Sequence, residues 1–215
     1  MNTDLDAWGH LSSATISDAL DRVQVAGQCF GLKALDPGFR LKGRAFTIRM
    51  SPVGTNKGTV GDYIEDVPPG QVVVLDNEGR LDATVCGDIL TAVAHRRGVA
   101  GTVIHGVCRD SALSLKLGYP MFSRGVYMRT GRDRVQAEGF HEPVSVGEIR
   151  VEPGDLIVGD GDGIVVVPQA REEVVLSAAL EIHETEEKIL LALNDGMALK
   201  EARKQFGYHQ LQRSR

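Results

Sequence analysis

The chain has 215 residues, of which 42% are hydrophobic and 25% are charged, and its formal net charge is −5. This length and composition are sufficient for one domain with a full hydrophobic core. The acidic balance, without a block rich in lysine and arginine, argues against a nucleic-acid partner. No apolar run reaches membrane-spanning length, the first ten residues do not have the pattern of a leader, and the three cysteines show no CxxC spacing. We therefore expect a cytoplasmic protein that acts on a small molecule.

The first half of the chain reads as alternating helices and strands. Residues 13–25 follow capping residues and have apolar positions at helical spacing, which predicts a helix. Strands are predicted over 41–50 and 71–76, with a short helix over 59–66 between them and a turn at Asn77–Arg80. The glycine-rich run 51–70 lacks the order of a phosphate-binding loop. Asn56 and Lys57 within it are nevertheless candidates to reach a site.

The central stretch, 86–125, carries the most chemical information. Its pattern predicts a helix over 88–97, a buried strand over 101–106, a helical segment over 111–117 and a strand over 121–124. Gly87 permits a tight turn, and the amides of Asp88, Ile89 and Leu90 at the helix start would be able to bind a carboxylate.

Arg109 and Asp110 follow the buried strand directly. Ligands of α/β proteins bind beyond the carboxyl ends of the strands, so this pair is a site candidate. Arg109 would bind the same carboxylate through two parallel hydrogen bonds, and Asp110 would supply a hard oxygen ligand to a divalent cation. The alternative interpretation is structural: Asp88 satisfies its own turn, and Arg109 and Asp110 form a simple ion pair.

Short β-runs begin at Pro143, and a long amphipathic helix is predicted over 171–193, with a final helix reaching Phe206. The segment Asp160–Gly163 is expected to be a hairpin turn, because it lacks the later glutamate of a calcium loop. His105 lies near the end of the central strand and is either a proton carrier or a hydrogen-bonded structural residue. The glutamates of the long helix are expected to be solvated: Glu181, Glu184, Glu186 and Glu187.

The run Gly87-Asp88-Ile89-Leu90, followed at a distance by Arg109-Asp110, resembles the signature of the 4-hydroxy-4-methyl-2-oxoglutarate / 4-carboxy-4-hydroxy-2-oxoadipate aldolases. This family also contains the regulator of ribonuclease activity A. The similarity extends from about Leu11 to Pro168 and includes SDALDR and PGDLIVGDGDGIVVVP. It implies an α/β fold, the swivelling β/β/α domain, over residues 1–168. Residues 169–215 would be a C-terminal helical extension that packs on the same domain or on a neighbouring subunit.

The resemblance also implies roles for the central residues. Arg109 would bind the pyruvate part of the substrate together with Gly87, Asp88, Ile89 and Leu90, and Asp110 would bind Mg²⁺ or Mn²⁺. Asp88 is placed to orient or deprotonate a water that takes the proton of the substrate alcohol. The family forms sites between subunits of trimers, with a glutamate from the neighbour near the metal, so we expect a homotrimer or homohexamer.

The sequence therefore predicts a metal-dependent carbon–carbon lyase. Its substrate would be a 4-hydroxy-2-oxo acid, cleaved to pyruvate and a second oxo acid, and oxaloacetate decarboxylation would leave the same enolate. Two alternatives remain. One is a non-catalytic regulator that binds a ribonuclease or helicase, and the other is a lyase of the same fold that acts on another hydroxy or sugar acid.

Overall fold

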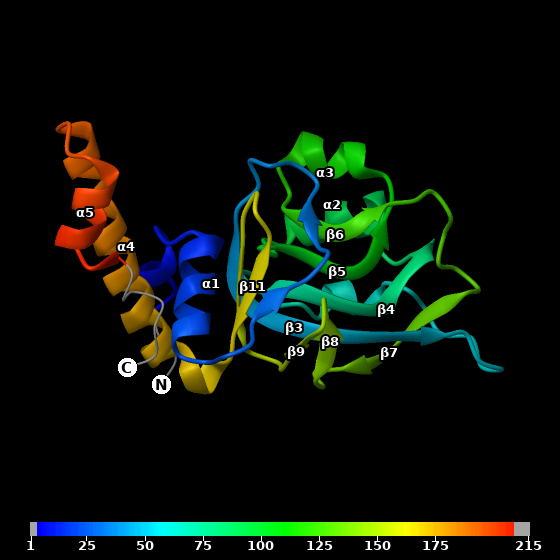
Figure 1. The fold of residues 1–215 in the computed structure, drawn as a ribbon. Helices are drawn as coiled ribbons and strands as arrows, with labels where there is room; N and C mark the ends of the chain where they lie inside the picture. The colour runs from blue at the N-terminus through cyan, green and yellow to red at the C-terminus, as the bar shows by residue number, and fades with distance from the viewer. Residues whose placement is uncertain (1–3, 209–215) are drawn as a thin grey trace.

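Four parallel strands form the centre of the molecule, for which a computed structural model describes residues 4–208. They are β3 (Leu41–Pro52), β4 (Val72–Thr84), β5 (Gly101–Cys108) and β6 (Met121–Val126), in that spatial order. Helices α2 (Asp88–Arg96) and α3 (Ser111–Leu117) connect β4 to β5 and β5 to β6, and both lie on one face of the sheet (Figure 1). The apolar alternation along the strands sends Ile48, Leu75 and Ile104 to this helical face.

The opposite face of the parallel sheet packs on a second β layer. The hairpin β10 (Leu156–Gly159) and β11 (Ile164–Val167) pairs through β10 with the first residues of β3, and β1 (Gln28–Cys29) pairs with β11. A second hairpin, β8 (Val144–Val146) and β9 (Ile149–Val151), crosses the same face. Val74 and Val103 of the parallel sheet meet Ile157 and Val166 of the second layer in one buried cluster.

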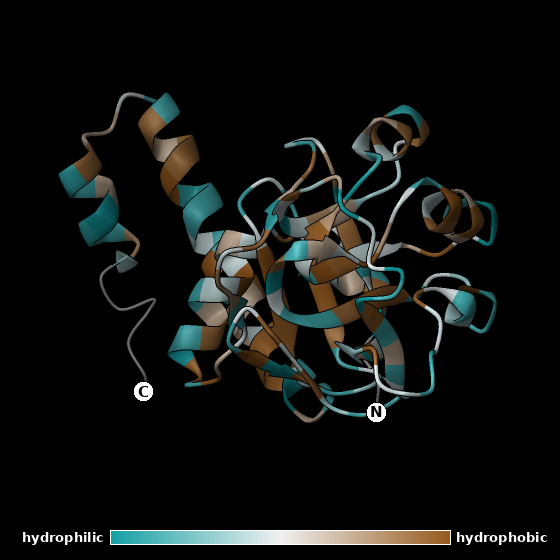
Figure 2. Ribbon diagram, turned by 90° about the vertical axis from the view of Figure 1, so that its right-hand side faces the viewer, coloured by the Kyte–Doolittle hydropathy of each residue, from teal (hydrophilic) through white to brown (hydrophobic). Residues whose placement is uncertain are grey.

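Two helices cover the outer side of the β10–β11 hairpin. These are α1 (Ser13–Arg22) and α4 (Glu172–Asn194), which is preceded by the short 3₁₀ turn η3 (Gln169–Arg171). Ile16, Leu20 and Ile182 pack on the side chains of β10 and β11 that point away from the parallel sheet. Figure 2 shows hydrophobic segments concentrated in the sheets between the helical layers. The layers thus form the expected swivelling β/β/α domain, followed by a C-terminal helical extension.

The beginning of α4 is tied to β3 by a buried ion pair. Glu172 is 1% exposed and contacts Arg44 through both carboxylate oxygens. Farther along, α4 leaves the body of the protein, and α5 (Leu199–Gln205) folds back against its C-terminal turns (Figure 1). No helix of residues 4–208 combines the length and apolar character required to cross a bilayer.

The structure corrects several sequence-based expectations. The predicted turn at Asn77–Arg80 is wrong: β4 runs on to Thr84, with an irregularity between Asp76 and Arg80 where Glu78 and Gly79 have positive φ. The predicted helix over 59–66 is only the 3₁₀ turn η2 (Asp62–Glu65). Elements that the sequence did not indicate are β1, β2 (Lys33–Ala34), β7 (Val135–Phe140), which pairs antiparallel with β3, and the 3₁₀ turn η1 (Leu5–Trp8).

Candidate functional site

Gly87 begins the site, because it is the residue at which the chain leaves β4 and enters α2. It serves as the N-cap, and its carbonyl accepts hydrogen bonds from the Thr91 amide and hydroxyl at 3.0 and 2.8 Å. The Ile89 amide donates to Asp88 Oδ1 at 2.8 Å, and the Asp88 amide donates to Asp110 Oδ2 at 3.3 Å. Two of the three amides expected to bind an anion therefore already have carboxylate acceptors. The carboxylate of Asp88 does satisfy its own turn, as the structural alternative expected.

Arg109 and Asp110 come to the same corner from the end of β5. The Arg109 amide donates to the Cys86 carbonyl at 3.0 Å, which holds the end of β5 beside the end of β4. Asp110 caps α3 with a left-handed backbone, φ 54°, and its Oδ2 lies 3.2 Å from Arg109 Nε. Their side chains are 37% and 40% exposed. The structure thus brings together Gly87, Asp88, Arg109 and Asp110, as the sequence predicted.

A side chain at position 87 would not fit this corner. A Cβ there would lie 2.7 Å from Asp110 Oδ2 and 3.1 Å from Arg109 Nε. Position 87 therefore requires glycine because the neighbouring side chains lie too close for a Cβ atom. Backbone conformation is not the reason, since a φ of −139° is accessible to any residue. Cys86, next to it, is buried, and burial raises the pKa of its thiol to about 12, so the sulfur stays protonated and unreactive at neutral pH.

The donor set at the corner fits a cation held by one protein carboxylate. Among residues 4–208 there is no cluster of three histidine, cysteine or acidic side chains able to form a closed metal cage. Mg²⁺ commonly binds through one or two carboxylates and completes its octahedron with waters and substrate oxygens. The side chain of Asp110 is 40% exposed beside Gly87, so its carboxylate is accessible for this role.

A cleft of about 640 Å³ opens from this corner across the ends of the parallel strands. It is lined by residues 57–62, 84–90 and 130–133, with Val53, Ile64, Glu65, Val93 and Arg109. Its far rim contains Lys57, whose Nζ lies 2.6 Å from Asp133 Oδ1. Lys57 therefore reaches the site, whereas Asn56 is not among the lining residues. Asp133 and Arg132 were not identified from the sequence; the only signal was the glycine-led, charged run TGRDR.

His105 lies on the other face of the parallel sheet. Its Nδ1 donates to the Ser145 carbonyl at 3.0 Å and lies 3.4 Å from Asp76 Oδ1. Asp76 also accepts the amides of Ser145 and Glu78 at 3.0 and 2.9 Å. Because these contacts hold β8 on the sheet and His105 does not line the cleft, we interpret it as a structural histidine.

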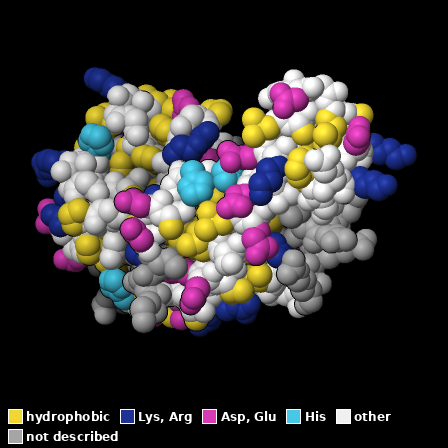
Figure 3. All heavy atoms as spheres, turned by 90° about the vertical axis from the view of Figure 1, so that its left-hand side faces the viewer, with side chains coloured by type: hydrophobic (Ala, Val, Ile, Leu, Met, Phe, Trp, Pro, Cys, Tyr) yellow, Lys and Arg dark blue, Asp and Glu magenta, His cyan; other side chains and the backbone are white. Residues whose placement is uncertain are grey.

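The glutamates of α4 make local contacts. Figure 3 shows one face of the molecule, on which acidic and basic side chains lie beside histidines near the centre. Glu181 Oε2 lies 2.6 Å from Arg22 Nη2, Glu184 lies 3.8 Å from Lys188, and Glu187 lies 3.6 Å from His183. Burial and the nearby Asp18 raise the pKa of Glu186. Within the subunit, these residues belong to the helical extension and not to the cleft.

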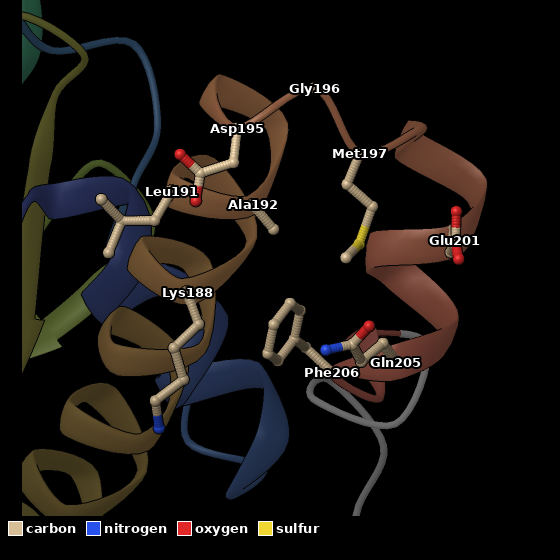
Figure 4. Close-up of a pocket in the computed structure, with 9 residues that line it drawn as sticks. All are labelled: Lys188, Leu191, Ala192, Asp195, Gly196, Met197, Glu201, Gln205 and Phe206. Carbon is tan, nitrogen blue, oxygen red and sulfur yellow. The ribbon is translucent and has the colours of Figure 1, made fainter.

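A second hollow of about 570 Å³ separates α4 from α5. Met197 and Phe206 point from the α5 side into this gap (Figure 4), and Glu201 is also among the residues that line it. Lys188 and Asp195 are at its margin. Among residues 4–208, no arginine and no strand end lines this hollow, so the described part of the chain offers no counterpart there to the Arg109–Asp110 pair.

The fold and this corner define an α/β protein with a charged cleft at the carboxyl edge of a parallel sheet. Residues 13–166 match the model of the RraA-like family, described as Aldolase/RraA, and the chain belongs to that family. Over 187 residues it is 32% identical to a protein of Halalkalibacterium halodurans named "Putative 4-hydroxy-4-methyl-2-oxoglutarate aldolase", covering 87% of each chain.

Other relatives extend the comparison. Protein DlpA of Legionella pneumophila is 38% identical over 93% of this chain, which spans only 33% of the length of DlpA. A crystal structure of an uncharacterised protein from Pseudomonas syringae superposes with a TM-score of 0.87 at 41% identity, covering 93% of this chain and 96% of that one. Streptomyces coelicolor RraAS2, described as an unusual member of the RNase ES inhibitor RraA protein family, gives a TM-score of 0.79 at 29% identity, covering 87% of this chain and 96% of that one.

Proposed function

We propose that this protein is a divalent-metal-dependent lyase that cleaves a 4-hydroxy-2-oxo acid to pyruvate and a second oxo acid. The observation that carries the proposal is the Arg109–Asp110 pair, which closely approaches Gly87 and places Arg109, but not Asp110, in the lining of the cleft. The aldolase names of relatives that cover most of the chain support the same reaction class. The same chemistry would decarboxylate oxaloacetate, because loss of carbon dioxide also leaves the enolate of pyruvate.

The roles of the residues follow from where charge develops. The bond between C3 and C4 of the substrate breaks, its electron pair moves into the enolate of pyruvate, and the C4 hydroxyl loses its proton. Arg109 would bind the substrate carboxylate and stabilise the developing enolate oxygen. Asp88 would accept the hydroxyl proton through a water, and delivery of a proton to C3 of the enolate would then give pyruvate. Asp110 would hold Mg²⁺ or Mn²⁺, which supplies Lewis-acid stabilisation of negative charge when bound.

The experiment is an assay of pyruvate release from a panel of 2-oxo acids, with and without Mg²⁺. Wild-type protein is expected to release pyruvate only with the metal. Asp110→Ala is expected to lose this turnover while retaining its circular dichroism spectrum, because the residue is exposed at the end of a strand. Full activity of Asp110→Ala would overturn the assignment of the metal ligand.

A second candidate function is favoured by the similarity to Streptomyces coelicolor RraAS2, which is described as an unusual member of a ribonuclease inhibitor family. In that case the fold surface would bind a ribonuclease and no 2-oxo acid would be consumed. Wild-type protein that releases no pyruvate from any member of the panel, and that inhibits a ribonuclease E-type enzyme, would support this function instead.

A further inference from the structure

The far rim of the cleft is built from two loops that the sheet brings together. Residues 53–61 follow β3 and residues 130–134 precede β7, and these two strands pair antiparallel with Pro52 opposite Val135. The loops meet in the ion pair between Lys57 Nζ and Asp133 Oδ1, at 2.6 Å. Both side chains are largely exposed, and both residues line the same cleft as Arg109.

The backbone on either side of Lys57 is fixed by hydrogen bonds to β7 and its loop. The Gly58 amide donates to Gln136 Oε1 at 2.8 Å, the Ala137 amide donates to the Thr59 carbonyl at 2.8 Å, and the Val53 amide donates to the Arg134 carbonyl at 3.0 Å. Lys57 is therefore presented from an ordered frame. An ammonium has three donor hydrogens, and the described residues occupy it with one carboxylate, so it retains donors for a ligand.

Lys57 and Arg109 line the same cleft from loops that follow two strands separated by β4. Arg109 follows β5, Gly87 follows β4, and the loop of Lys57 follows β3, and these strands are consecutive neighbours in the sheet. Because the two cations line one cleft from separate loops, an acid with a carboxylate at each end offers an acceptor to each of them.

We propose that Lys57 binds the second carboxylate of the substrate, at the end opposite the 2-oxo acid group, and that Asp133 holds Lys57 in place when no such group is bound. This inference rests on the proposed function and assigns the dicarboxylate preference of that site to one ion pair. The hydrogen bond and charge of Lys57 lower the pKa of Asp133, so the pair is ionised at neutral pH. A substrate without a second carboxylate leaves the Lys57–Asp133 ion pair intact, and Lys57 adds nothing to its binding affinity.

Asp133 competes with the second carboxylate of the substrate for the ammonium of Lys57. Substitutions of Lys57 and of Asp133 should therefore have opposite effects on dicarboxylate binding. Removing Lys57 removes the cation that the second carboxylate needs. Removing the charge of Asp133 releases Lys57 and also removes a negative charge from the rim, so binding of a dicarboxylate improves. A purely structural pair would show the same effect from both substitutions, because either change breaks the link between the loops.

The test compares two five-carbon ligands that differ in the second carboxylate, 2-oxoglutarate and 2-oxopentanoate. Their binding in the presence of Mg²⁺ is measured by titration calorimetry with wild type, Lys57→Met and Asp133→Asn. We expect Lys57→Met to weaken 2-oxoglutarate binding about fivefold, the upper range for one exposed charge pair, and Asp133→Asn to tighten it about threefold. The affinity for 2-oxopentanoate should stay within about twofold in both variants.

The matched control is Arg150→Met, which removes a cation from another exposed pair, Arg150 Nε–Glu152 Oε1 at 2.9 Å, outside this cleft. It should change neither affinity. The inference is overturned if Lys57→Met weakens both ligands equally or neither, or if Asp133→Asn weakens 2-oxoglutarate. The proposed function fails by a different result, the absence of pyruvate release from every substrate, whatever the binding preference of the rim.

Discussion

Arg109 presents a planar fork at the head of the cleft, and the shape of that fork is as important as its charge. Lysine at this position keeps the charge but offers a single ammonium, which cannot contact a carboxylate and an enolate oxygen together. We expect Arg109→Lys to lower kcat/KM for pyruvate release about a hundredfold. Steady-state kinetics at saturating Mg²⁺ measures the loss. Near-native turnover would show that Arg109 only balances the charge of Asp110.

Gly87 is the position where the smallest substitution should disturb the corner. A Cβ would crowd the Asp110 carboxylate at 2.7 Å, whereas a Cβ at Gly54 would meet nothing within 4 Å. We expect Gly87→Ala to displace Asp110 and to raise the Mg²⁺ concentration for half-maximal activity several-fold, with little change in Tm. Gly54→Ala is the control and should behave as wild type. An unchanged Mg²⁺ dependence in Gly87→Ala would contradict the proximity argument.

Asp76 should contribute a component of stability that depends on pH. Burial alone would raise the pKa of its carboxyl group, but hydrogen bonds from His105 and from the amides of Ser145 and Glu78 outweigh burial and lower the pKa. Because the folded pKa lies below the unfolded value of about 3.9, this stabilisation is fully present above that value and is lost as the pH falls through the folded pKa.

The corresponding measurement is the free energy of unfolding of Asp76→Asn and wild type between pH 7 and pH 3. At pH 7 the variant should be less stable by about 1–3 kcal/mol, the cost of weakening a buried charged acceptor, and the difference should shrink below pH 4. The exposed Asp82→Asn serves as the control and should show a much smaller difference. A difference that does not change with pH would exclude Asp76 as the titrating group.

At the scale of elements, α4 is held to the body mainly by its apolar face. Ile182 is 1% exposed between α1 and the β10–β11 hairpin, whereas Val174 on the same helix is 43% exposed. Ile182→Ala should lower the free energy of unfolding by about 3 kcal/mol, because it removes buried methyl groups and leaves a cavity. Val174→Ala should change it much less. Urea denaturation followed by circular dichroism compares the two variants.

Elements with strong local signals were predictable, and those created by pairing were not. Glycines and apolar periodicity marked α2 and β5 to within one or two residues at most ends. The strands β1 and β2 have two residues each, too few for a pattern, and β7 contains Gly139 and an irregular pairing with β3. The bend at Asn77–Arg80 resembles a turn in sequence, but pairing with β5 resumes beyond it.

The same distinction applies to the site. Gly87, Asp88, Arg109 and Asp110 belong to one short run of sequence in which strand, turn and helix follow each other, so their meeting was predictable. Lys57 and Asp133 are 76 residues apart, and their contact depends on the antiparallel pairing of β3 with β7. His105 looked close to the corner along the chain, but the side chains of a strand alternate between faces, and it points to the second β layer.

At the scale of the whole molecule, the cleft lacks a wall. Ile89 at its edge is 75% exposed, and the side chains of Arg109 and Asp110 are more than a third exposed, although a site that stabilises an enolate benefits from excluding water. We therefore expect a closed trimer or a pair of trimers that covers the cleft with a neighbouring subunit. Light scattering should give a mass that is a multiple of three chains, and a fully active monomer would contradict the expectation.

Subunit mixing tests whether the neighbour contributes to the reaction. One set of subunits carries Asp110→Ala, and the other has glutamine in place of the four glutamates of α4. If a glutamate from one subunit completes the site of the next, each set alone is inactive and the mixture recovers part of the activity. Recovery would fail if the glutamates served only the ion pairs that they make within their own subunit.

The strand β3 belongs to both β layers: its first residues pair with β10, and its last residues pair with β4 and β7. Neither layer can lose its structure without breaking hydrogen bonds along this one strand, so the two layers should melt in a single cooperative transition. The amides of β3 should then exchange with deuterium only through global unfolding, while those of α5, which contacts little besides α4, should exchange first. The two β layers would thus share one melting temperature, whereas α5 would unfold locally and independently of them.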